Sequence, residues 1–358
     1  MHKINFCSGP AILPPSVYNS AIEAIRDYDN TGLSILELSH RSSSIVSMIQ
    51  ETKLLVKELL SISEEYEVLF LHGGASMQFC MIPMNFLSPS TKAYYTLTGQ
   101  WASNAYQEAQ LLGNADILCS SADSNFNYLP TLQPAYTLDN SAYVHFTSNN
   151  TIYGTQWKSY PTFNCPIIAD MSSDLFSKKI NVHQFDLIYA GAQKNIGIAG
   201  VCMVIIKKSL LEQQNKSIST MLNYNTHLMH ESSFNTPPVF AIYTCNLNLK
   251  WLKSIGGVEE IEKINQLKAQ LLYTEIERNS LFEYIVPNPA DRSLMNVTFV
   301  AKNKEIEIAF KEYCKMNNIV SIDGYRTVGG FRASIYNAMP IQDVQLFVDL
   351  MKSFESKL

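Results

Sequence analysis

Short apolar runs alternate with amphipathic stretches of helical period through the first two thirds of the chain. Seven of these runs have the length of strands: 66–71, 92–98, 115–119, 143–146, 166–169, 186–189 and 201–206. Several are apolar throughout rather than alternating, as in strands that are buried on both faces of a sheet. The pattern predicts an α/β fold with a large domain, in which helices flank a mostly parallel seven-stranded sheet.

The pattern changes after about residue 255. The elements expected there are a charged amphipathic helix, two strands and two further helices, at 258–279, 294–300, 329–336, 305–317 and 341–358. This mixture is typical of a smaller α+β domain. We expect a large domain over residues 15–255 and a small domain formed by 1–14 and 256–358. No Gly/Ser-rich linker separates them, so they should pack together.

Composition narrows the class of partner. The chain has 358 residues, 46% of them hydrophobic, which is enough for a sizeable core. A formal net charge of −5 and the lack of any Lys/Arg run argue against nucleic acid or a membrane surface as partner. The N-terminus does not resemble a signal peptide, and no apolar run approaches the roughly 18 to 20 residues of a membrane span. The seven cysteines lack metal-ligand spacing, so we expect reduced core thiols, no metal and a cytoplasmic location.

A glycine-rich turn follows the first strand-like run. Residues 72–76, His-Gly-Gly-Ala-Ser, precede a helical stretch at 77–87, so backbone N–H groups and a hydroxyl would lie at the carboxyl end of the strand. Such a turn can bind an anion. Alone the motif is weak, because Gly-Gly before a helix is more often only a tight turn. It also lacks the spacings of a dinucleotide fold or a Walker A loop.

Two charged residues follow neighbouring candidate strands. Asp170 ends one of them, where a buried carboxylate needs a cation, a metal or several donors; a role as N-cap, shared with Ser172 and Ser173, is equally compatible. Lys194 lies just past the next strand, so both side chains could emerge at the carboxyl edge of one sheet. With the Gly-Gly turn, they match the needs of pyridoxal phosphate: a carboxylate for the ring nitrogen, an amine for a Schiff base and donors for the phosphate.

Longer motifs carry a resemblance to a known family and span nearly the whole chain. They are 6–14 (FCSGPAILP), 37–42 (ELSHRS), 73–76 (GGAS), 99–101 (GQW), 169–173 (ADMSS), 191–195 (GAQKN), 235–238 (NTPP) and 328–340 (VGGFRASIYNAMP). On these motifs the chain resembles the phosphoserine aminotransferases, which are class V aminotransferases of fold type I. The resemblance implies pyridoxal 5'-phosphate as cofactor, bound by the large domain.

The resemblance also implies a role for each motif in the cofactor site. Lys194 would form the Schiff base and move the proton at the substrate Cα, Asp170 would hold the protonated ring nitrogen, and Trp101 would stack on the ring. The other implied cofactor contacts are Ala75, Ser76 and Gln193 at the phosphate, Thr151 near the ring hydroxyl, and Asn235 and Thr236 reaching the phosphate from a neighbouring subunit. Because Thr236 precedes Pro237, the sequence predicts a helix that starts there with free N–H groups facing an anion. Since Asn235 and Thr236 would act in a neighbouring subunit, we expect a homodimer.

The arginines define the substrate side of the resemblance. Arg332 resembles the residue that binds the substrate α-carboxylate through its planar guanidinium, a geometry that lysine cannot reproduce. His40 and Arg41, with Arg326, resemble the set that binds the substrate phosphate or the distal carboxylate of glutamate, although an isolated arginine is more often part of a surface ion pair. One position departs from the family, which usually has His-Arg where this chain has Tyr325-Arg326. Tyrosine donates a hydrogen bond but brings no positive charge.

The resemblance implies an enzyme that moves an amino group from L-glutamate to 3-phosphohydroxypyruvate, giving O-phospho-L-serine and 2-oxoglutarate. It also allows 3-hydroxy-2-oxo-4-phosphonooxybutanoate, a pyridoxine precursor, as a second substrate. Two alternatives stay open. One is another enzyme of the same fold, such as an alanine–glyoxylate aminotransferase or a cysteine desulfurase, although no cysteine stands out in a mobile Gly/Ser-rich loop. The other is a non-catalytic α/β binding protein, against which the joint presence of Lys194, Asp170, Trp101 and Arg332 argues.

Overall fold

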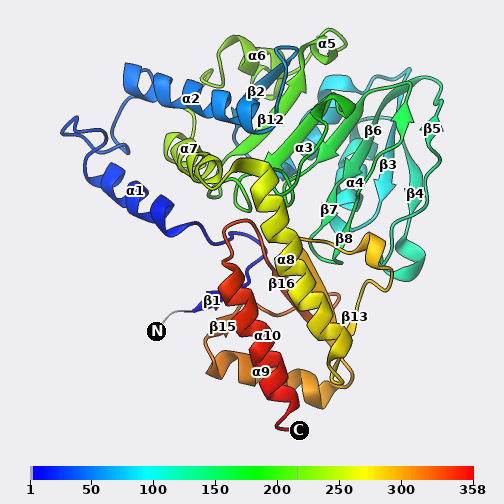
Figure 1. Ribbon diagram of the computed structural model, residues 1–358. Helices are drawn as coiled ribbons and strands as arrows, with labels where there is room; N and C mark the ends of the chain where they lie inside the picture. Colours follow the sequence, from blue (N-terminus) through cyan, green and yellow to red (C-terminus); the bar gives the residue numbers. More distant parts are fainter. Residues whose placement is uncertain (1–2, 216) are drawn as a thin grey trace.

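Seven strands form one central sheet (Figure 1). The computed structural model describes residues 3–215 and 217–358. The sheet has the order β2-β12-β11-β10-β6-β3-β4, formed by β2 (Tyr66–Leu71), β3 (Lys92–Leu97), β4 (Ala115–Ser120), β6 (Ser141–Thr147), β10 (Ile167–Asp170), β11 (Leu187–Gly191) and β12 (Cys202–Lys207). Neighbouring pairs from β4 to β11 are all parallel, whereas β12 is antiparallel to both β11 and β2. The predicted mostly parallel sheet of seven strands is confirmed.

Helices cover both faces of this sheet. On one face lie α1 (Pro15–Arg26), α2 (Ser43–Leu59) and α7 (Val239–Ser254), and on the other lie α3 (Gly74–Phe86), α4 (Gln100–Leu112) and α6 (Tyr224–Met229). In β11, Ile188 packs into the first core and Leu187 and Tyr189 pack into the second. Both faces of the strand are therefore buried, which explains why its sequence is an unbroken apolar run.

The residues after α7 form a smaller layered unit. Its elements are α8 (Gly257–Arg278), β13 (Phe282–Tyr284), β14 (Asn296–Ala301), α9 (Lys304–Met316), β15 (Ile319–Val320), β16 (Phe331–Ser334) and α10 (Ile341–Glu355), and β1 (Ile4–Asn5) pairs with β15. Ile4 and Phe6 share its core. The long helix α8 belongs to both parts of the molecule, because Val258 and Ile261 pack in the core of the larger part and Leu272 and Ile276 pack in the smaller core (Figure 1). The division at residue 255 remains a prediction.

The remaining elements are short and connect the larger ones. They are β5 (Ala135–Tyr136), β7 (Asn149–Asn150), β8 (Thr155–Gln156), β9 (Thr162–Phe163), α5 (Lys208–Leu211) and the 3₁₀ turns η1 (Ala122–Ser124), η2 (Val182–Gln184), η3 (Thr220–Leu222) and η4 (Pro289–Asp291). All seven cysteines are unpaired, but only Cys202, Cys245 and Cys314 are buried, so the prediction of core thiols is wrong for the other four.

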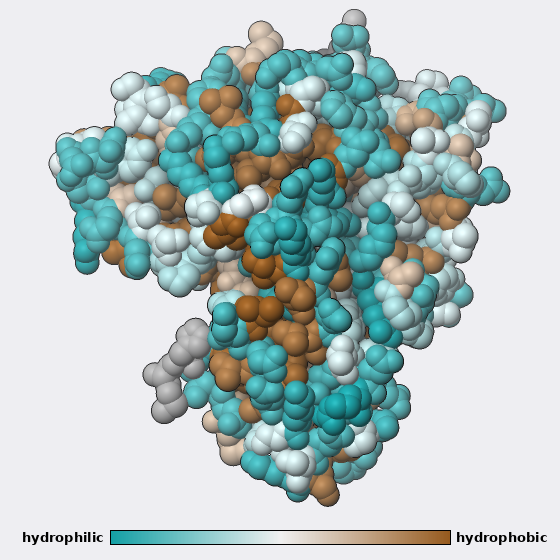
Figure 2. All heavy atoms as spheres, in the orientation of Figure 1, coloured by the Kyte–Doolittle hydropathy of each residue, from teal (hydrophilic) through white to brown (hydrophobic). Residues whose placement is uncertain are grey.

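The face of the molecule shown in Figure 2 is mostly hydrophilic, and apolar residues gather on it over α8 and α10, among other places. A groove between these two helices is lined by the apolar side chains of Leu267, Leu271, Ile341 and Val348. No helix among the described residues combines the length and hydropathy that a membrane span requires. Nor do those residues hold a cluster of His, Cys, Asp or Glu arranged to bind a metal ion.

Candidate active site

A cavity of about 460 Å³ lies at the carboxyl edge of the sheet. Eight of the residues predicted for the site line it: Ala75, Ser76, Trp101, Thr151, Asp170, Gln193, Lys194 and Arg332. A larger groove of about 990 Å³ lies between α1, α2 and α7, but it contains none of them. The smaller cavity is the better candidate, because ligands of open α/β sheets bind at this edge and its volume falls in the range of small-molecule sites.

Asp170 is the last residue of β10 and is only 5% exposed. The backbone N–H and the hydroxyl of Ser172 both donate hydrogen bonds to its Oδ1 atom. Burial raises the pKa of the carboxyl group, while the charge of Lys194 and the hydrogen bonds from Ser172 act to lower it. A buried carboxylate held in this way is suited to a cationic partner inside the cavity.

Lys194 lies three residues after the end of β11 and lines the cavity. No described residue accepts a hydrogen bond from its Nζ atom. Burial lowers the pKa of this amine, although Asp170 and Asp174 act to raise it. Asn195 fixes the backbone beside it. Its Nδ2 atom donates to Ser173 O at 3.1 Å and its Oδ1 atom accepts from Asn337 N at 3.0 Å. A lysine whose neutral form is favoured by burial can serve as nucleophile and base.

The Gly-Gly turn forms the first turn of α3. The helix begins at Gly74, earlier than the stretch predicted from residue 77, so Ala75 and Ser76 carry N–H groups that have no partner within the helix. Gly73 adopts φ +85°, and a Cβ atom there would lie 2.5 Å from Met77 Cβ. The close turn therefore requires glycine, and it presents the positive end of a helix to the cavity.

Trp101 and Arg332 are joined through Thr151. The indole Nε1 donates to Thr151 Oγ1 at 3.1 Å, and Nη1 of Arg332 donates to Thr151 O at 3.2 Å. Trp101 is the second residue of α4, while Arg332 lies on β16, so the contacts connect the two parts of the molecule. The Nε atom of Arg332 is buried without a partner among the described residues, as is Thr147 Oγ1, and both residues line the cavity.

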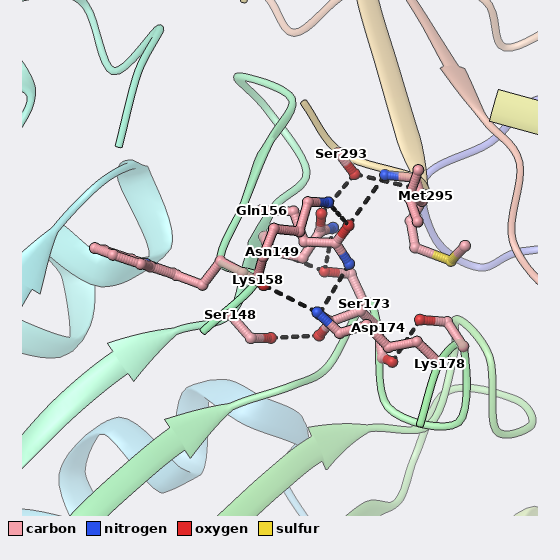
Figure 3. Close-up of polar contacts among 12 residues, drawn as sticks. Ser148, Asn149, Gln156, Lys158, Ser173, Asp174, Lys178, Ser293 and Met295 are labelled. Atoms are coloured by element: carbon pink, nitrogen blue, oxygen red, sulfur yellow. Dashed lines mark hydrogen bonds and ion pairs between the residues drawn. The ribbon is translucent and has the colours of Figure 1, made fainter. Parts of the chain in front are cut away.

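A polar network that begins at the cavity wall fixes the loops that carry these side chains (Figure 3). Asn149 Nδ2 donates to Ser173 Oγ and to Asn296 Oδ1, both at 2.8 Å, and its Oδ1 atom accepts from Ser293 Oγ at 2.5 Å. Asp174 accepts hydrogen bonds from Ser148 and Gln156. The network ties the loop after β6 to the loop after β10 and to the start of β14.

Five residues predicted for the site do not line this cavity: His40, Arg41, Asn235, Thr236 and Arg326. His40 and Arg41 instead border a separate concavity with His230 and Glu231. The predicted helix start at Pro237 with Thr236 as N-cap is wrong, because α7 begins at Val239 and its N-cap is Pro238. The second proline explains the delay, since a residue that precedes proline is disfavoured in helical conformation.

Several lining residues were absent from the predicted set, among them Thr147, Asn149, Ser172, Ser173 and Tyr325. Ser172 and Ser173 adjoin the strand-end Asp170, and Thr147 is paired with Asp170 in the parallel register of β6 and β10. A search of all polar residues at the carboxyl ends of the predicted strands would have found these three. Tyr325 follows no predicted strand, and its signal in the sequence was its place beside Arg326 in the family comparison.

Comparison with known proteins agrees with the geometry. The family model "Aminotransferase class-V" matches residues 4–347. The phosphoserine aminotransferase of Flavobacterium psychrophilum is 47% identical over 360 aligned positions, which cover 100% of both chains. Two solved phosphoserine aminotransferases superpose closely: one described for radiation damage of its Schiff base (TM-score 0.95, 42% identity, 100% of both chains) and the PLP-bound enzyme of Trichomonas vaginalis (TM-score 0.91, 31% identity, 98% of this chain and 100% of that one). The chain belongs to the class-V aminotransferase family and, within it, to the phosphoserine aminotransferases.

Proposed function

We propose that this enzyme uses pyridoxal phosphate to transfer the amino group of L-glutamate to 3-phosphohydroxypyruvate, giving O-phospho-L-serine and 2-oxoglutarate. The observation that carries the proposal is the convergence of Asp170, Lys194, Trp101 and Arg332 on one cavity at the sheet edge. Full-length similarity to phosphoserine aminotransferases supports the substrate pair. The cytoplasm is the proposed location.

The residues of the cavity fit the cofactor. Four polar groups that line it have no protein partner among the described residues: Asp170 Oδ2, Lys194 Nζ, Thr147 Oγ1 and Arg332 Nε. Thr147 Oγ1 and Arg332 Nε are also buried. Buried polar groups are nearly always hydrogen-bonded, so these two call for a polar ligand. The helix terminus at Ala75 and Ser76 adds a site for an anion. A carboxylate, an amine and an anion site are what the ring nitrogen, the carbonyl and the phosphate of pyridoxal phosphate require.

When bound, pyridoxal phosphate supplies the carbonyl carbon that receives the amino group and a ring that withdraws electrons from the substrate Cα. In our proposal Asp170 would keep the ring nitrogen protonated and Trp101 would pack on the ring. Lys194 would hold the carbonyl carbon and would take and return the proton at Cα; its lowered pKa favours the neutral amine that this task needs. The proposed phosphate contacts are the N–H groups of Ala75 and Ser76 with Gln193, and Thr151 would lie near the ring hydroxyl.

The proposed enzyme is a homodimer in which each site is completed by the neighbouring subunit. Arg332 would bind the substrate α-carboxylate from within the same chain. Asn235 and Thr236 do not line the cavity of their own chain, which supports their proposed role at the cofactor phosphate of the neighbour. His40 and Arg41 likewise do not line the cavity of their own chain, which supports a role in the neighbour's site. There we propose that they bind the substrate phosphate or the distal carboxylate of glutamate. Arg41 is exposed, and no described acidic residue pairs with it. Arg326 completes this proposed set.

The first test is the visible spectrum of the purified protein. We expect a yellow absorbance that glutamate removes and 3-phosphohydroxypyruvate restores, because the two half-reactions convert the cofactor in opposite directions. Hydroxypyruvate without the phosphate is the matched control and should restore the absorbance far more slowly. Faster conversion of the unphosphorylated acid would favour another aminotransferase, and a protein that cannot be loaded with pyridoxal phosphate would favour a non-catalytic binder. The same assay with 3-hydroxy-2-oxo-4-phosphonooxybutanoate tests the proposed second substrate.

A further inference from the structure

Ser172 lies two residues beyond Asp170 and is 6% exposed. Its backbone N–H donates to Asp170 Oδ1 at 2.9 Å and its hydroxyl donates to the same oxygen at 2.6 Å. The hydroxyl oxygen in turn accepts a hydrogen bond from the backbone N–H of Gly191 at 3.1 Å. Gly191 is the last residue of β11 and precedes Lys194 by three positions. One hydroxyl group therefore links the carboxylate at the end of β10 to the strand that leads to the lysine.

These contacts make the two oxygens of Asp170 unequal. Oδ1 receives both hydrogen bonds from Ser172, whereas Oδ2 receives none from the described residues. Thr147, which is the register partner of Asp170 on β6, has a buried hydroxyl without a described partner in the same cavity. With Oδ1 held in place, the carboxylate cannot rotate without losing two hydrogen bonds. Oδ2 is then the oxygen left for a ligand.

We propose that Ser172 is a positioning residue, which fixes the Asp170 carboxylate so that Oδ2 is left to accept a hydrogen bond from the protonated ring nitrogen of the cofactor. The inference rests on the role proposed above for Asp170. Ser172 does not itself need to touch the cofactor. Its hydroxyl acts on the carboxylate and, through Gly191, on the backbone ahead of Lys194.

The arrangement has a consequence for pH dependence. Hydrogen bonds to a carboxylate favour its charged form, so Ser172 opposes the rise in the pKa of Asp170 that burial causes. The groups that face this carboxylate from the surrounding elements are Lys194, Asp174, Tyr189 and Cys202. Burial raises the pKa of Tyr189 and Cys202 far above neutrality, and it lowers that of His145, which contacts Tyr189, to about 3. Tyr189, Cys202 and His145 therefore do not change charge between pH 5 and 8.

The test measures the affinity of the apoenzyme for pyridoxal phosphate by tryptophan fluorescence between pH 5 and 8, without substrate. Ser172→Ala should raise the dissociation constant about tenfold at pH 7.5. It should also shift the acid limb of the affinity curve to higher pH, by about one unit, because Asp170 then accepts a proton more readily. Titration of the cofactor itself and of Lys194 is common to all variants, so the comparison with the unmodified enzyme isolates this shift.

Ser173→Ala is the matched control. Ser173 is 2% exposed, and its hydroxyl makes two hydrogen bonds, but both are with Asn149 rather than with the carboxylate. This variant should leave the acid limb in place even if it lowers stability. Ser172→Thr keeps the hydroxyl and should restore the limb, and Ser172→Cys, with a weak donor of similar size, should give a smaller shift than alanine. If the alanine variant does not fold, the shift of the acid limb in the cysteine variant tests the role of Ser172 instead.

The ring nitrogen provides a second readout. In enzyme loaded with ¹⁵N-labelled cofactor, the nitrogen chemical shift should report a lower protonated fraction in Ser172→Ala at pH 7.5. An unmoved acid limb and nitrogen shift, or equal changes in Ser173→Ala, would overturn the role of Ser172. Asp170→Asn separates this from the parent proposal: if that variant also leaves both readouts unchanged, the role of Asp170 itself fails.

Discussion

At the scale of single residues, Tyr325 is the side chain most open to a change of specificity. It is 38% exposed and lines the cavity, while its neighbour Arg326 lies outside it. The sequence resemblance leads us to expect a histidine at this position. We expect Tyr325→His to lower the KM for 3-phosphohydroxypyruvate about fivefold at pH 6, where imidazole with a pKa near 6.5 carries a charge, and much less at pH 8. The KM for glutamate should change little. Steady-state kinetics at both pH values measure the effect.

Tyr325→Phe is the control for this substitution, because it removes the hydroxyl and adds no charge. It should raise the KM for the phosphorylated substrate slightly at both pH values. Equal changes in the KM of both substrates would mean that residue 325 does not face the phosphate, and the selectivity would then depend on the remaining cationic residues.

At the scale of elements, the first turn of α3 depends on two glycines that differ in their surroundings. Both have positive φ, but a Cβ on Gly73 would clash with Met77, whereas a Cβ on Gly74 would meet nothing within 4 Å. We expect Gly74→Ala to cost about 1 kcal/mol of unfolding free energy from its backbone conformation alone, and Gly73→Ala about 3 kcal/mol. Gly73→Ala should also weaken cofactor binding, since the displaced turn carries the N–H groups of Ala75 and Ser76. Urea unfolding and cofactor titration compare the pair; similar losses in both variants would contradict the steric argument.

The strands of the central sheet show which features of the fold the apolar pattern of the sequence predicts. All seven predicted strands lie in one sheet, with ends that agree to within two residues, because strands buried on both faces are continuous apolar runs. Such a run does not encode direction, so nothing in 201–206 indicated that β12 runs antiparallel. Strand ends placed Asp170 and Lys194 correctly at one edge. The contact of Ser172 with the carboxylate could not be predicted, because it depends on a side-chain rotamer. The sequence introduced Ser172 only as a residue that could share an N-cap role with Asp170.

At the scale of the whole molecule, the chain supplies only part of the residues proposed for one site. His40, Arg41, Asn235 and Thr236 lie away from the cavity that contains Lys194. In a dimer with shared sites, each chain would give these residues to its neighbour and receive the same set in return, as two-fold symmetry requires. Neither chain would then form a complete site alone, and complementation between two defective chains becomes a direct test.

The test mixes Lys194→Ala with the double variant Asn235→Ala/Thr236→Ala, refolded together so that subunits exchange. Each parent dimer has two defective sites. If the sites are shared, a mixed dimer has one site with both defects and one with none, because the intact Lys194 then meets the intact Asn235 and Thr236 of the other chain. Random pairing should restore about a quarter of the native activity at equal amounts of the two chains. If all these residues act within one chain, mixing restores nothing, and a protein that is fully active as a monomer in sedimentation would exclude the shared site altogether.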